Sequence, residues 1–361
     1  MPQVYDTISG EIYDIPCEYI NGNTVVAKTL YDYDSLLLKF CEGRKAEKTA
    51  EAEKALPSEV VSLPDYVPFT LSERNVLLLD TAEFSLDGGE FRAEEEILRL
   101  DNICREAVGY SERGGHVIQP WCLDEEIPSH KITLRFRINS DIDYSGAELA
   151  AEDMETLSIR FNGKEVSNKV TGWYTDKDIK TAALPEIRKG ENILEIDVPF
   201  GTRTNTEWCY ILGNFGVEVN GRNKKLIALP EKLAFGSILN QGLPFYGGNI
   251  TYHLEAESNG ALQIEATNYK GTLISVAVDG AEKGKIVYPP YVLLADGLKP
   301  GSHKIDITLF GNRYNAFGPV HLCNDKESWH GPGAWRSSGC AWCYEYVLRT
   351  VGILNSPIIK K

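Results

Sequence analysis

Long apolar runs are missing from this chain of 361 residues. A membrane-spanning helix needs about 20 consecutive apolar residues, and no run approaches that length. Residues 1–30 also lack the basic segment and the apolar segment that together mark a secretory signal. We therefore expect a soluble chain without an export signal, located in the cytoplasm.

Positive charge is in short supply. The chain has 37 Lys and Arg residues against 52 Asp and Glu residues, which gives a formal net charge of −15. Such a surface repels phosphate backbones and anionic lipid heads, so nucleic acid and membranes are excluded as partners. A neutral ligand such as a glycan is compatible with this charge, although the charge does not select it.

Methionine is scarce, whereas glycine and aromatic residues are plentiful. The chain has 2 Met, against 32 Gly, 18 Tyr, 12 Phe and 6 Trp. Aromatic residues favour strands, and glycine favours the turns between them. The composition therefore predicts an all-β protein.

A disulfide framework is also missing. A chain of this size buries a core without cross-links, and its cysteines are not spaced as in small secreted domains. We interpret them as mostly reduced thiols. The eight are Cys17, Cys41, Cys104, Cys122, Cys209, Cys323, Cys340 and Cys343.

Residues 1–41 form a separate N-terminal β segment in this interpretation. Strand patterns cover 11–15, 24–27 and 35–40, with an Asn-Gly turn between the first two. Small isolated sheets are marginal in water, so we expect the tail of a missing domain or a piece packed on a neighbour. Residues 42–58 are charged and alanine-rich and are predicted to be a linker.

One helix interrupts the strand patterns that follow. Glu94–Val108 carries apolar residues at helical spacing and stops at Gly109. The strand pattern resumes over 132–138, where alternate residues are apolar. The helix is therefore interpreted as an insertion in a β domain, with its acidic residues capping it or facing solvent.

An internal repeat is the most informative feature. In the first copy, 157–161 alternates into an Asn-Gly turn and 194–198 forms a later strand. In the second copy, 274–278 alternates into an Asp-Gly turn and 305–309 forms the later strand. Each copy continues through Phe-Gly, an Arg-x-Asn pair and a second Phe-Gly to a predicted last strand.

The repeat predicts tandem β-sandwiches, because each strand of a sandwich sends alternate residues into the core. We place the first sandwich at 59–222 and the second at 223–361. The boundary falls in the polar, turn-rich stretch 220–225.

Three stretches of the second copy, 276–280, 288–291 and 298–307, resemble the galactose-binding-like jelly roll of family 2 and rhamnosidase-type glycoside hydrolases. Residues 75–84 and 97–102 resemble the C-terminal region of such multidomain proteins. The resemblance covers residues 59–361. It implies a galactose-binding-like sandwich that accompanies a separate catalytic barrel, in which many copies act only as braces.

A catalytic barrel is not predicted in this chain. A (β/α)₈ barrel needs about 250 residues of alternating strands and helices, and one convincing helix is present. No Gly-x-Ser-x-Gly elbow and no phosphate-binding loop occurs. No catalytic residue is therefore assigned, and the resemblance indicates fold more than substrate.

Aromatic loops are the candidate sugar-binding sites, because a ring stacks on the apolar face of a sugar while polar side chains bind its hydroxyls. Each candidate has the alternative of packing in the core or covering a sheet edge. The loop at 329–336 is favoured because it is glycine-rich and has two tryptophans. The candidates are Trp329, Trp335, Arg336, Tyr246, Asn249, Trp173 and Tyr174.

The pairs Arg203/Asn205 and Arg313/Asn315 recur at equivalent places in the two copies. Paired ligand sites and paired scaffolding both explain the recurrence. We favour scaffolding, because an arginine that fastens a turn would be retained whatever the two copies bind.

The acidic runs 94–96 and 124–126 are interpreted as solvated surface. A zinc site at Cys340 and Cys343 is disfavoured, because a spacing of three on a strand sends the two sulfurs to opposite faces. No metal site and no cofactor are assigned, and a structural calcium ion is left open.

The sequence therefore predicts a non-catalytic carbohydrate-binding or domain-bracing region of a glycoside hydrolase, whose partners are an oligosaccharide and a catalytic barrel domain. Two alternatives stay open. One is a complete glycosidase with its site between the sandwiches, and the other is a module that assembles with protein.

Overall fold

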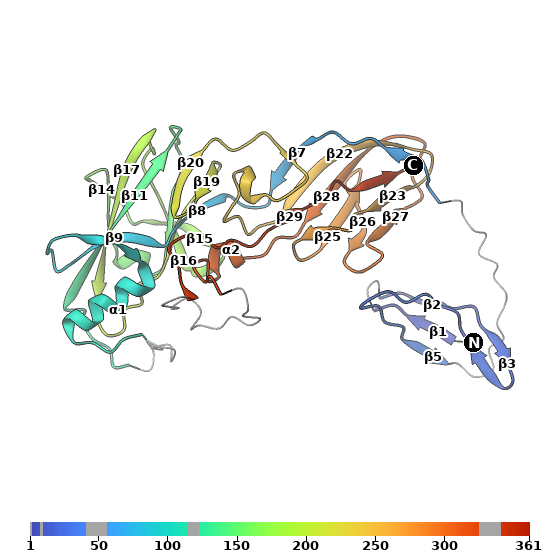
Figure 1. Ribbon diagram of the computed structural model, residues 1–361, viewed down its shortest axis with the longest axis horizontal. Coiled ribbons are helices and arrows are strands. Elements are labelled where there is room, and N and C mark those ends of the chain that lie inside the picture. The colour runs from blue at the N-terminus through green and yellow to red at the C-terminus, as the bar shows by residue number, and fades with distance from the viewer. Residues whose placement is uncertain (1, 8–9, 41–55, 114–122, 325–340) are drawn as a thin grey trace. The chain divides into compact units, whose positions relative to one another are not determined.

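The computed structural model describes residues 2–7, 10–40, 56–113, 123–324 and 341–361. These residues form antiparallel sheets with little helix, so the predicted all-β class is confirmed (Figure 1).

The chain makes two compact units. Unit 1 combines Met1–Asp65, Tyr252–Leu309 and Ile353–Lys361, and unit 2 combines Tyr66–Thr251 and Phe310–Gly352. Each unit thus draws on separate stretches of the chain, whereas the predicted sandwiches are continuous. The limits of those sandwiches stay a prediction.

The larger sheet of unit 2 runs in the order β10-β9-β11-β17-β13-β14, with β20 beside β11 and β19 beside β20. Only β11 and β20 are parallel to each other among its described pairs. Its strands are β9 (Thr81–Leu86), β10 (Arg92–Glu96), β11 (His130–Ser140), β13 (Ser158–Phe161), β14 (Lys164–Val166), β17 (Gly190–Phe200), β19 (Gly216–Asn220) and β20 (Asn223–Ile227).

A second sheet of unit 2 runs in the order β15-β16-β12-β18-β8. Its strands are β8 (Asn75–Leu79), β12 (Glu148–Ala151), β15 (Val170–Tyr174), β16 (Asp176–Ala183) and β18 (Cys209–Gly213). Unit 2 also contains the pair β7 (Tyr66–Leu71) and β21 (Lys232–Ala234), the short helices η2 (Met154–Thr156), η3 (Leu239–Gln241) and α2 (Tyr314–Phe317), and the helix α1 (Ile97–Val108).

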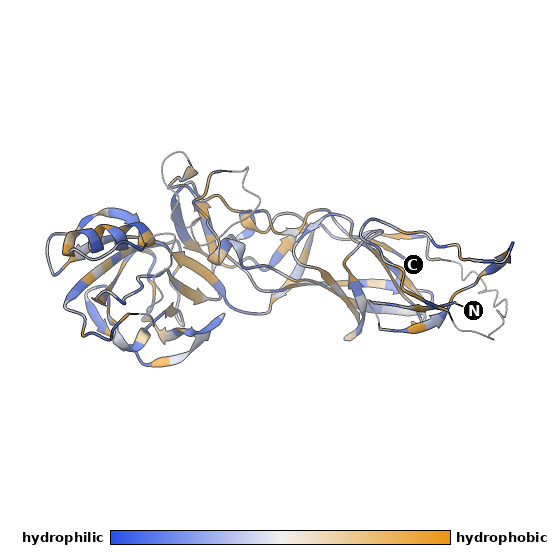
Figure 2. Cartoon of the chain, turned by 90° about the horizontal axis from the view of Figure 1, so that it is seen from below, coloured by the Kyte–Doolittle hydropathy of each residue, from blue (hydrophilic) through white to orange (hydrophobic). Residues whose placement is uncertain are grey.

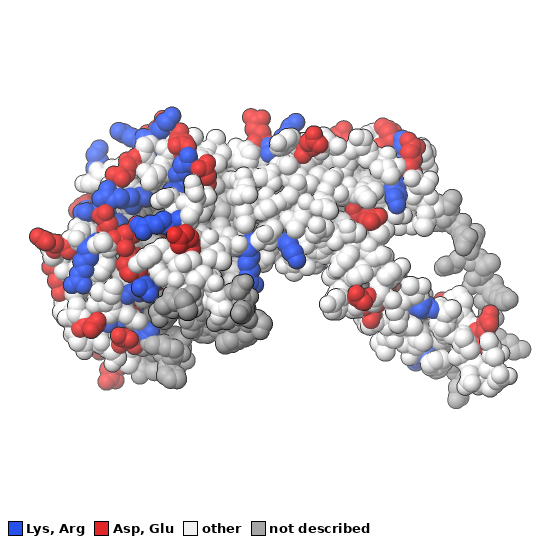
Figure 3. Space-filling model, viewed as in Figure 1, with Lys and Arg blue, Asp and Glu red and all other residues white. Residues whose placement is uncertain are grey.

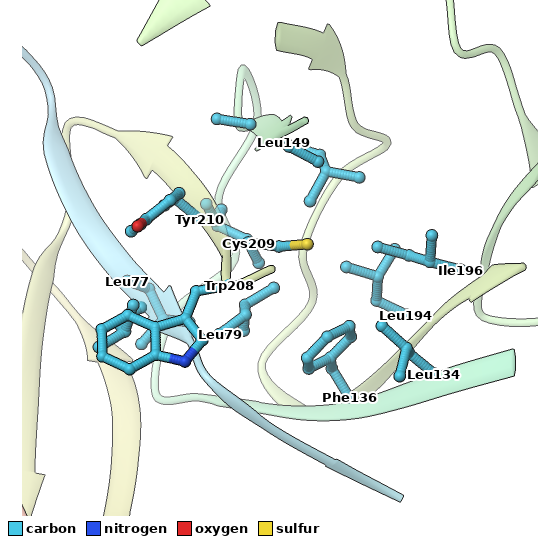
Figure 4. Packing of buried hydrophobic residues seen from close by; sticks show 14 of the residues in the cluster. Leu77, Leu79, Leu134, Phe136, Leu149, Leu194, Ile196, Trp208, Cys209 and Tyr210 are labelled. Carbon is cyan, nitrogen blue, oxygen red and sulfur yellow. The ribbon is translucent and has the colours of Figure 1, made fainter. Parts of the chain in front are cut away.

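The core of unit 2 follows from the two-residue period of its strands. Leu134 and Phe136 on β11 lie opposite Ile196 and Leu194 on β17, and all four are buried. They pack with Leu149 and other residues of the second sheet (Figure 4). Orange stretches of strand beside blue loops reflect the same division (Figure 2). The predicted alternation over 132–138 is confirmed.

The outer face of the larger sheet carries alternating charges. Arg135 and Arg160 both bind Glu195, and Arg160 also binds Asp197. Side chains of both signs lie interspersed over β9, β11 and β17 (Figure 3). These paired charges keep the outer face of the sheet hydrated. They add little stability, but they keep a wide apolar surface from being exposed to solvent.

The inserted helix is confirmed as α1, and it ends as predicted at Gly109, which adopts the left-handed conformation. Its start differs from the prediction, because 92–96 continue a strand. Glu96 is the N-cap and accepts hydrogen bonds from the backbone N–H groups of Leu98 and Arg99. Glu96 is completely buried, so the interpretation of 94–96 as solvated surface was wrong for this residue.

Unit 1 holds the sheets β2-β1-β5 and β27-β23-β30-β6, the pair β3-β4, and the order β22-β28-β25-β26. The N-terminal strands are β1 (Pro2–Tyr5), β2 (Ile12–Asp14), β3 (Glu18–Ile20), β4 (Asn23–Val25) and β5 (Leu38–Phe40). The others are β6 (Val60–Val61), β22 (Ile250–Ser258), β23 (Leu262–Glu265), β24 (Tyr269–Lys270), β25 (Ile274–Val278), β26 (Ala281–Ile286), β27 (Val292–Ala295), β28 (Gly301–Leu309), β29 (Gly352–Ile353) and β30 (Ile358–Lys360).

The internal repeat is visible in the pairing of the strands. In the first copy β13 pairs with β14 through the Asn-Gly turn and with β17 on its other side. In the second copy β25 pairs with β26 through the Asp-Gly turn and with β28 on its other side. The two segments therefore share one local topology, and each lies in a different unit.

The last strand of the second copy was predicted wrongly. The first copy reaches β19, but residues 318–322 form a turn that ends in a single bridge between Leu322 and Trp342. Pro319 has no N–H to offer a neighbouring strand, and Val320 donates instead to the carbonyl of Gly318. The prediction against zinc assumes a strand over 340–348, but the described part of this stretch, 341–348, forms this bridge and no strand.

Among the described residues, no helix combines the length and the apolar character needed to cross a membrane.

Candidate functional site

Unit 2 contains a pocket of about 540 Å³. Its apolar lining includes Leu134 and Ile196 of the larger sheet and Cys209 of the second sheet, so the pocket lies where the two sheets part. Polar side chains complete the lining. They are Glu126, Glu152, Asp153, Thr156, Arg203, Thr204, Asn205, Thr206 and Glu207.

The loop 202–207 forms one wall of this pocket and is held from behind by two buried arginines. Arg105 donates to the carbonyl oxygens of Thr202, at 3.2 Å, and Thr204. Arg113 donates to the carbonyl oxygen of Thr206 at 3.1 Å. Asp101 balances their charge, with an oxygen 2.9 Å from Arg105. The wall is therefore fixed before any ligand binds, which lowers the entropy cost of binding.

Among the described residues, two buried polar atoms in this wall have no hydrogen-bond partner: Oδ1 of Asn205 and Oγ1 of Thr206. A buried polar atom left unpaired costs about 1–3 kcal/mol. Neither atom has surface open to the pocket, so a ligand oxygen cannot reach either one while the loop keeps this conformation. The lining offers a ligand its other polar side chains, such as Arg203 and Glu152.

Glu152 belongs to the lining of the pocket and is an exposed residue. Even so, partial burial of its carboxyl raises the pKa of Glu152 to about 7, helped by the negative charges of Glu207 and Asp153. Asp153 has a left-handed backbone, with φ of 51°, and begins η2. A carboxyl in a pocket that titrates near neutral pH is typical of binding and catalytic sites.

Glu126 closes another side of the pocket. Its carboxylate accepts hydrogen bonds from the backbone N–H and the hydroxyl of Thr202, the latter at 2.6 Å, and these bonds lower its pKa. It is thus tied to the loop 202–207. The predicted solvated run 124–126 does not describe this residue fully.

A second group of polar residues lies buried elsewhere in unit 2. Asp80 accepts hydrogen bonds from Lys224 at 2.6 Å, Tyr346 at 2.6 Å and His321 at 2.9 Å. Burial by itself would raise the pKa of Asp80, but the charge of Lys224 and the bond from His321 hold it well below its usual range. These bonds fasten the segment after 341 to the core, although Nδ1 of His321 has no partner among the described residues.

Metal binding finds no support in the described part of the chain, where no three His, Cys, Asp or Glu side chains gather in a way that could hold an ion. Cys343 lies within this part, whereas Cys340 lies outside it. A structural calcium ion stays an untested expectation.

The structure places the predicted sugar-binding residues in three ways. Trp329, Trp335 and Arg336 lie outside the described residues. Trp173 and Tyr174 lie in strand β15 and not between strands, so Trp173 is 58% exposed while Tyr174 is buried against Phe317. An exposed tryptophan on an edge strand is a second place where a sugar could stack.

Tyr246 and Asn249 belong to a closed network. Tyr246 is buried and donates its hydroxyl to the carbonyl oxygen of Asn249 at 2.9 Å. Its hydroxyl also accepts from the backbone of Glu73, whose carboxylate binds Arg313. The guanidinium of Arg313 lies 5.8 Å from the ring of Tyr174. Tyr246, Asn249, Arg313 and Tyr174 thus lie in one network. Their contacts are with other parts of the protein, so their role is structural.

The two Arg-x-Asn pairs have different surroundings. Asn315 is buried and exchanges two hydrogen bonds, each of 2.9 Å, with the backbone of Arg349. Arg203 and Asn205 instead line the pocket, and Arg203 lies 3.8 Å from the exposed Glu125. The Arg-x-Asn pair therefore occupies an equivalent place in both copies. Among the pockets described, only the first copy has one at this place.

Sequence reasoning missed Glu152, Thr206 and Glu207. The first of them follows β12 and the other two precede β18, so no local motif joins them. The recurring Arg-x-Asn was the one signal that pointed to this loop. This sequence signal could not show whether the loop lines a pocket or is only a turn held by hydrogen bonds.

Comparisons with known proteins found only distant likenesses. No family model matches the chain, and no curated protein matches it. Among solved structures, a rhamnosidase from Novosphingobium sp. PP1Y is 12% identical over 66% of this chain and 23% of its own, with a TM-score of 0.27. A GH2 beta-galacturonidase from Eisenbergiella tayi is 12% identical over 65% of this chain and 36% of its own, with a TM-score of 0.25.

An anti-sigma factor domain-containing protein from Clostridium clariflavum is 9% identical over 66% of this chain and 90% of its own, with a TM-score of 0.16. The chain spans about a quarter to a third of the two hydrolases. At such identities and TM-scores these likenesses support no inference about activity.

Proposed function

We propose that this chain is a non-catalytic carbohydrate-binding module and that the pocket in unit 2 holds the sugar. The observation that supports the proposal most is the pocket itself, which joins an apolar lining to polar side chains beside a loop that is fixed by buried arginines. Sugar hydroxyls both donate and accept hydrogen bonds, so they suit polar side chains such as Arg203 and Glu152. The apolar lining at Leu134 and Ile196 suits the carbon face of a ring.

The finer assignment is that the module serves a glycoside hydrolase whose catalytic barrel is a separate domain. The sequence resemblance motivates this step. The barrel domain would then be the protein partner of this chain. The glycan would bind both to this chain and to the barrel domain.

The test is a calorimetric screen of purified chain against oligosaccharides, with pocket variants. Arg203→Ala and Glu152→Ala each remove a polar side chain of the lining and should weaken the binding of a glycan about tenfold, because each removes a hydrogen bond to the ligand. Trp173→Ala is the matched control, since it removes an exposed aromatic residue outside the pocket lining.

Loss of binding in the control alone would move the site to strand β15 and refute the pocket. Silence across a broad panel would refute carbohydrate binding and leave a brace or a module that assembles with protein.

Hydrolysis is the second candidate, because the pKa of Glu152 near 7 leaves a proton available at neutral pH. A glycosidase needs such an acid and a second carboxylate, for which Glu207 and Asp153 are at hand in the lining. Turnover of aryl glycosides by the wild-type chain, lost in Glu152→Gln, would establish it. No turnover in the presence of binding would leave the module non-catalytic.

A further inference from the structure

Two thiols of unit 2 lie next to each other, and neither belongs to the lining of the pocket described above. The thiols of Cys323 and Cys343 share a hydrogen bond, so their sulfur atoms are neighbours. Both are free thiols; Cys323 is exposed and Cys343 is half-buried. A small molecule from solvent can therefore reach the pair.

The backbone places both thiols on one face of a short antiparallel contact. Leu322 and Trp342 form the bridge, and the N–H groups of Cys323 and Cys343 donate the two hydrogen bonds of 3.0 Å that flank it. Each cysteine follows one member of the bridged pair. Successive side chains in extended backbone point to opposite faces, so both cysteines lie on the face away from Leu322 and Trp342. The pairing of the thiols thus follows from the backbone as well as from the side chains.

The segments that carry the two thiols are each anchored to the core of unit 2. His321, just before the Cys323 segment turns away, binds the carboxylate of Asp80 at 2.9 Å. Tyr346, which follows Cys343, donates its hydroxyl to the same carboxylate at 2.6 Å. These anchors keep each thiol at a high effective concentration beside the other, which favours a bond between them over a bond to an outside thiol.

The two thiols differ in the way that a stepwise disulfide exchange requires. Burial, and then the contact with Cys323, raises the pKa of Cys343 to about 11, so this thiol keeps its proton at neutral pH. The exposed Cys323 is therefore the thiol that meets an outside disulfide first, and Cys343 is placed to displace the outside group. Exposed disulfides are also the ones that are readily reduced again.

We propose that Cys323 and Cys343 are a redox modification site, which forms a reversible disulfide with a small disulfide such as oxidised glutathione as the oxidant. The Cys323 thiolate attacks one glutathione sulfur, and the other glutathione leaves as a thiolate. Cys343 then releases its proton, attacks Sγ of Cys323 and displaces the second glutathione. Two protein thiols are oxidised, one glutathione disulfide is reduced, and the two leaving thiolates take up the two protons.

The test treats the full chain with oxidised glutathione at about pH 8, where thiolates are more abundant. Remaining thiols are then alkylated, and the chain is digested with trypsin and analysed by mass spectrometry. The expected product joins peptide 314–326, which contains Cys323, to peptide 337–349, which contains Cys343. Dithiothreitol should separate the two peptides again.

Three variants assign the bond. Cys340 lies in the same peptide as Cys343, so Cys340→Ser is the matched control and should form the linked product as the wild type does. Cys343→Ser should abolish the linked product and retain glutathione on Cys323. Cys323→Ser should slow the oxidation of Cys343 at least about tenfold, because a protonated, half-buried thiol is a poor first attacker.

Hydrogen exchange on the wild-type chain gives a readout that needs no variant. Oxidation should slow the exchange of the Cys323 and Cys343 amides, because the new bond holds the bridge between their strands closed.

The other outcomes overturn the proposal. They are a bond between Cys340 and Cys343 in the wild type, a linked product that survives Cys343→Ser, and a disulfide between two chains. Glutathione that stays on Cys323 of the wild type, or a chain that is not oxidised, would show that the two neighbouring thiols do not react with each other. None of these results bears on the proposed carbohydrate binding, which is tested separately.

Discussion

Single residues in unit 2 are charged or neutral according to what surrounds them. Asp80 stays ionised because Lys224 and His321 bind it, whereas burial raises the pKa of Glu96 to about 7 and the charge of Asp80 adds to the rise. The two carboxyls thus differ in protonation although both are completely buried. The hydrogen bond from Trp208 to Glu96, at 2.6 Å, opposes the rise without cancelling it.

The raised pKa of Glu96 makes the stability of the protein depend on pH. The folded state binds the proton more tightly than the unfolded state, so the contribution is complete below the unfolded pKa, near 4.5, and is lost as the pH rises through about 7. The total is roughly 3 kcal/mol. Urea unfolding of wild type should show this decline from about pH 5 to pH 8.

Glu96→Gln should make that decline shallower, because the amide does not titrate in this range, whereas Glu152 still contributes its own decline. Glu106→Gln, on the exposed side of the same helix, is the control and should follow the wild-type curve. Curves of wild type and Glu96→Gln that run parallel would assign the decline to another group.

Turns between strands use one arrangement three times. Asp87, Asn162 and Asp279 each adopt a left-handed backbone before a glycine. Each donates its backbone N–H to a residue of a neighbouring strand and accepts that residue's N–H on its side chain: Lys131, Ile193 and Lys304 respectively. The arrangement fixes the register of each hairpin against a third strand.

The glycine of such a turn should be irreplaceable. Gly280 has φ of 79°, so Gly280→Ala should lower the free energy of unfolding by about 1–2 kcal/mol. Asp279→Asn should leave it nearly unchanged, since Asn162 makes the same backbone bonds in the first copy. Thermal unfolding followed by circular dichroism would measure both. Equal stability of the alanine variant would show that the turn adapts.

Elements whose signal is local could be predicted from the sequence. The Asn162 and Asp279 turns were found because a positive φ restricts the residue type, and α1 was found from its apolar spacing and Gly109. The pocket could not be found, because Glu152 and Thr206 are brought together only by the pairing of β12 with β18, which are far apart in the sequence. The prediction of a last strand in the second copy was wrong although its sequence motif is present. Pro319 prevents that segment from pairing as a strand.

At the scale of the molecule, unit 1 depends on strands from distant parts of the sequence. Its sheet β27-β23-β30-β6 places β30 between β23 and β6, so each of those two strands pairs with a segment far away in the chain. Ile359, at the centre of β30, is completely buried. The integrity of this sheet therefore depends on β30.

Deletion of 353–361 should expose the amides of β23 and β6 to hydrogen exchange, because both lose their common neighbour. Amides of β11 and β17 in unit 2 should keep their protection, since their sheet contains no residue of the deleted segment. Hydrogen-exchange mass spectrometry would resolve the two sets of peptides. Protection of β23 that survives the deletion would contradict this dependence.

The central place of β30 also determines when the sheet of unit 1 can form during synthesis. A ribosome makes β6 first and β23 much later, and neither can pair with β30 until that strand has left the exit tunnel. Until then, unsatisfied strand edges are open to any extended peptide in the cell. Chaperones that shield nascent chains would therefore matter more for unit 1 than for the sheets of unit 2, whose strands follow one another more closely.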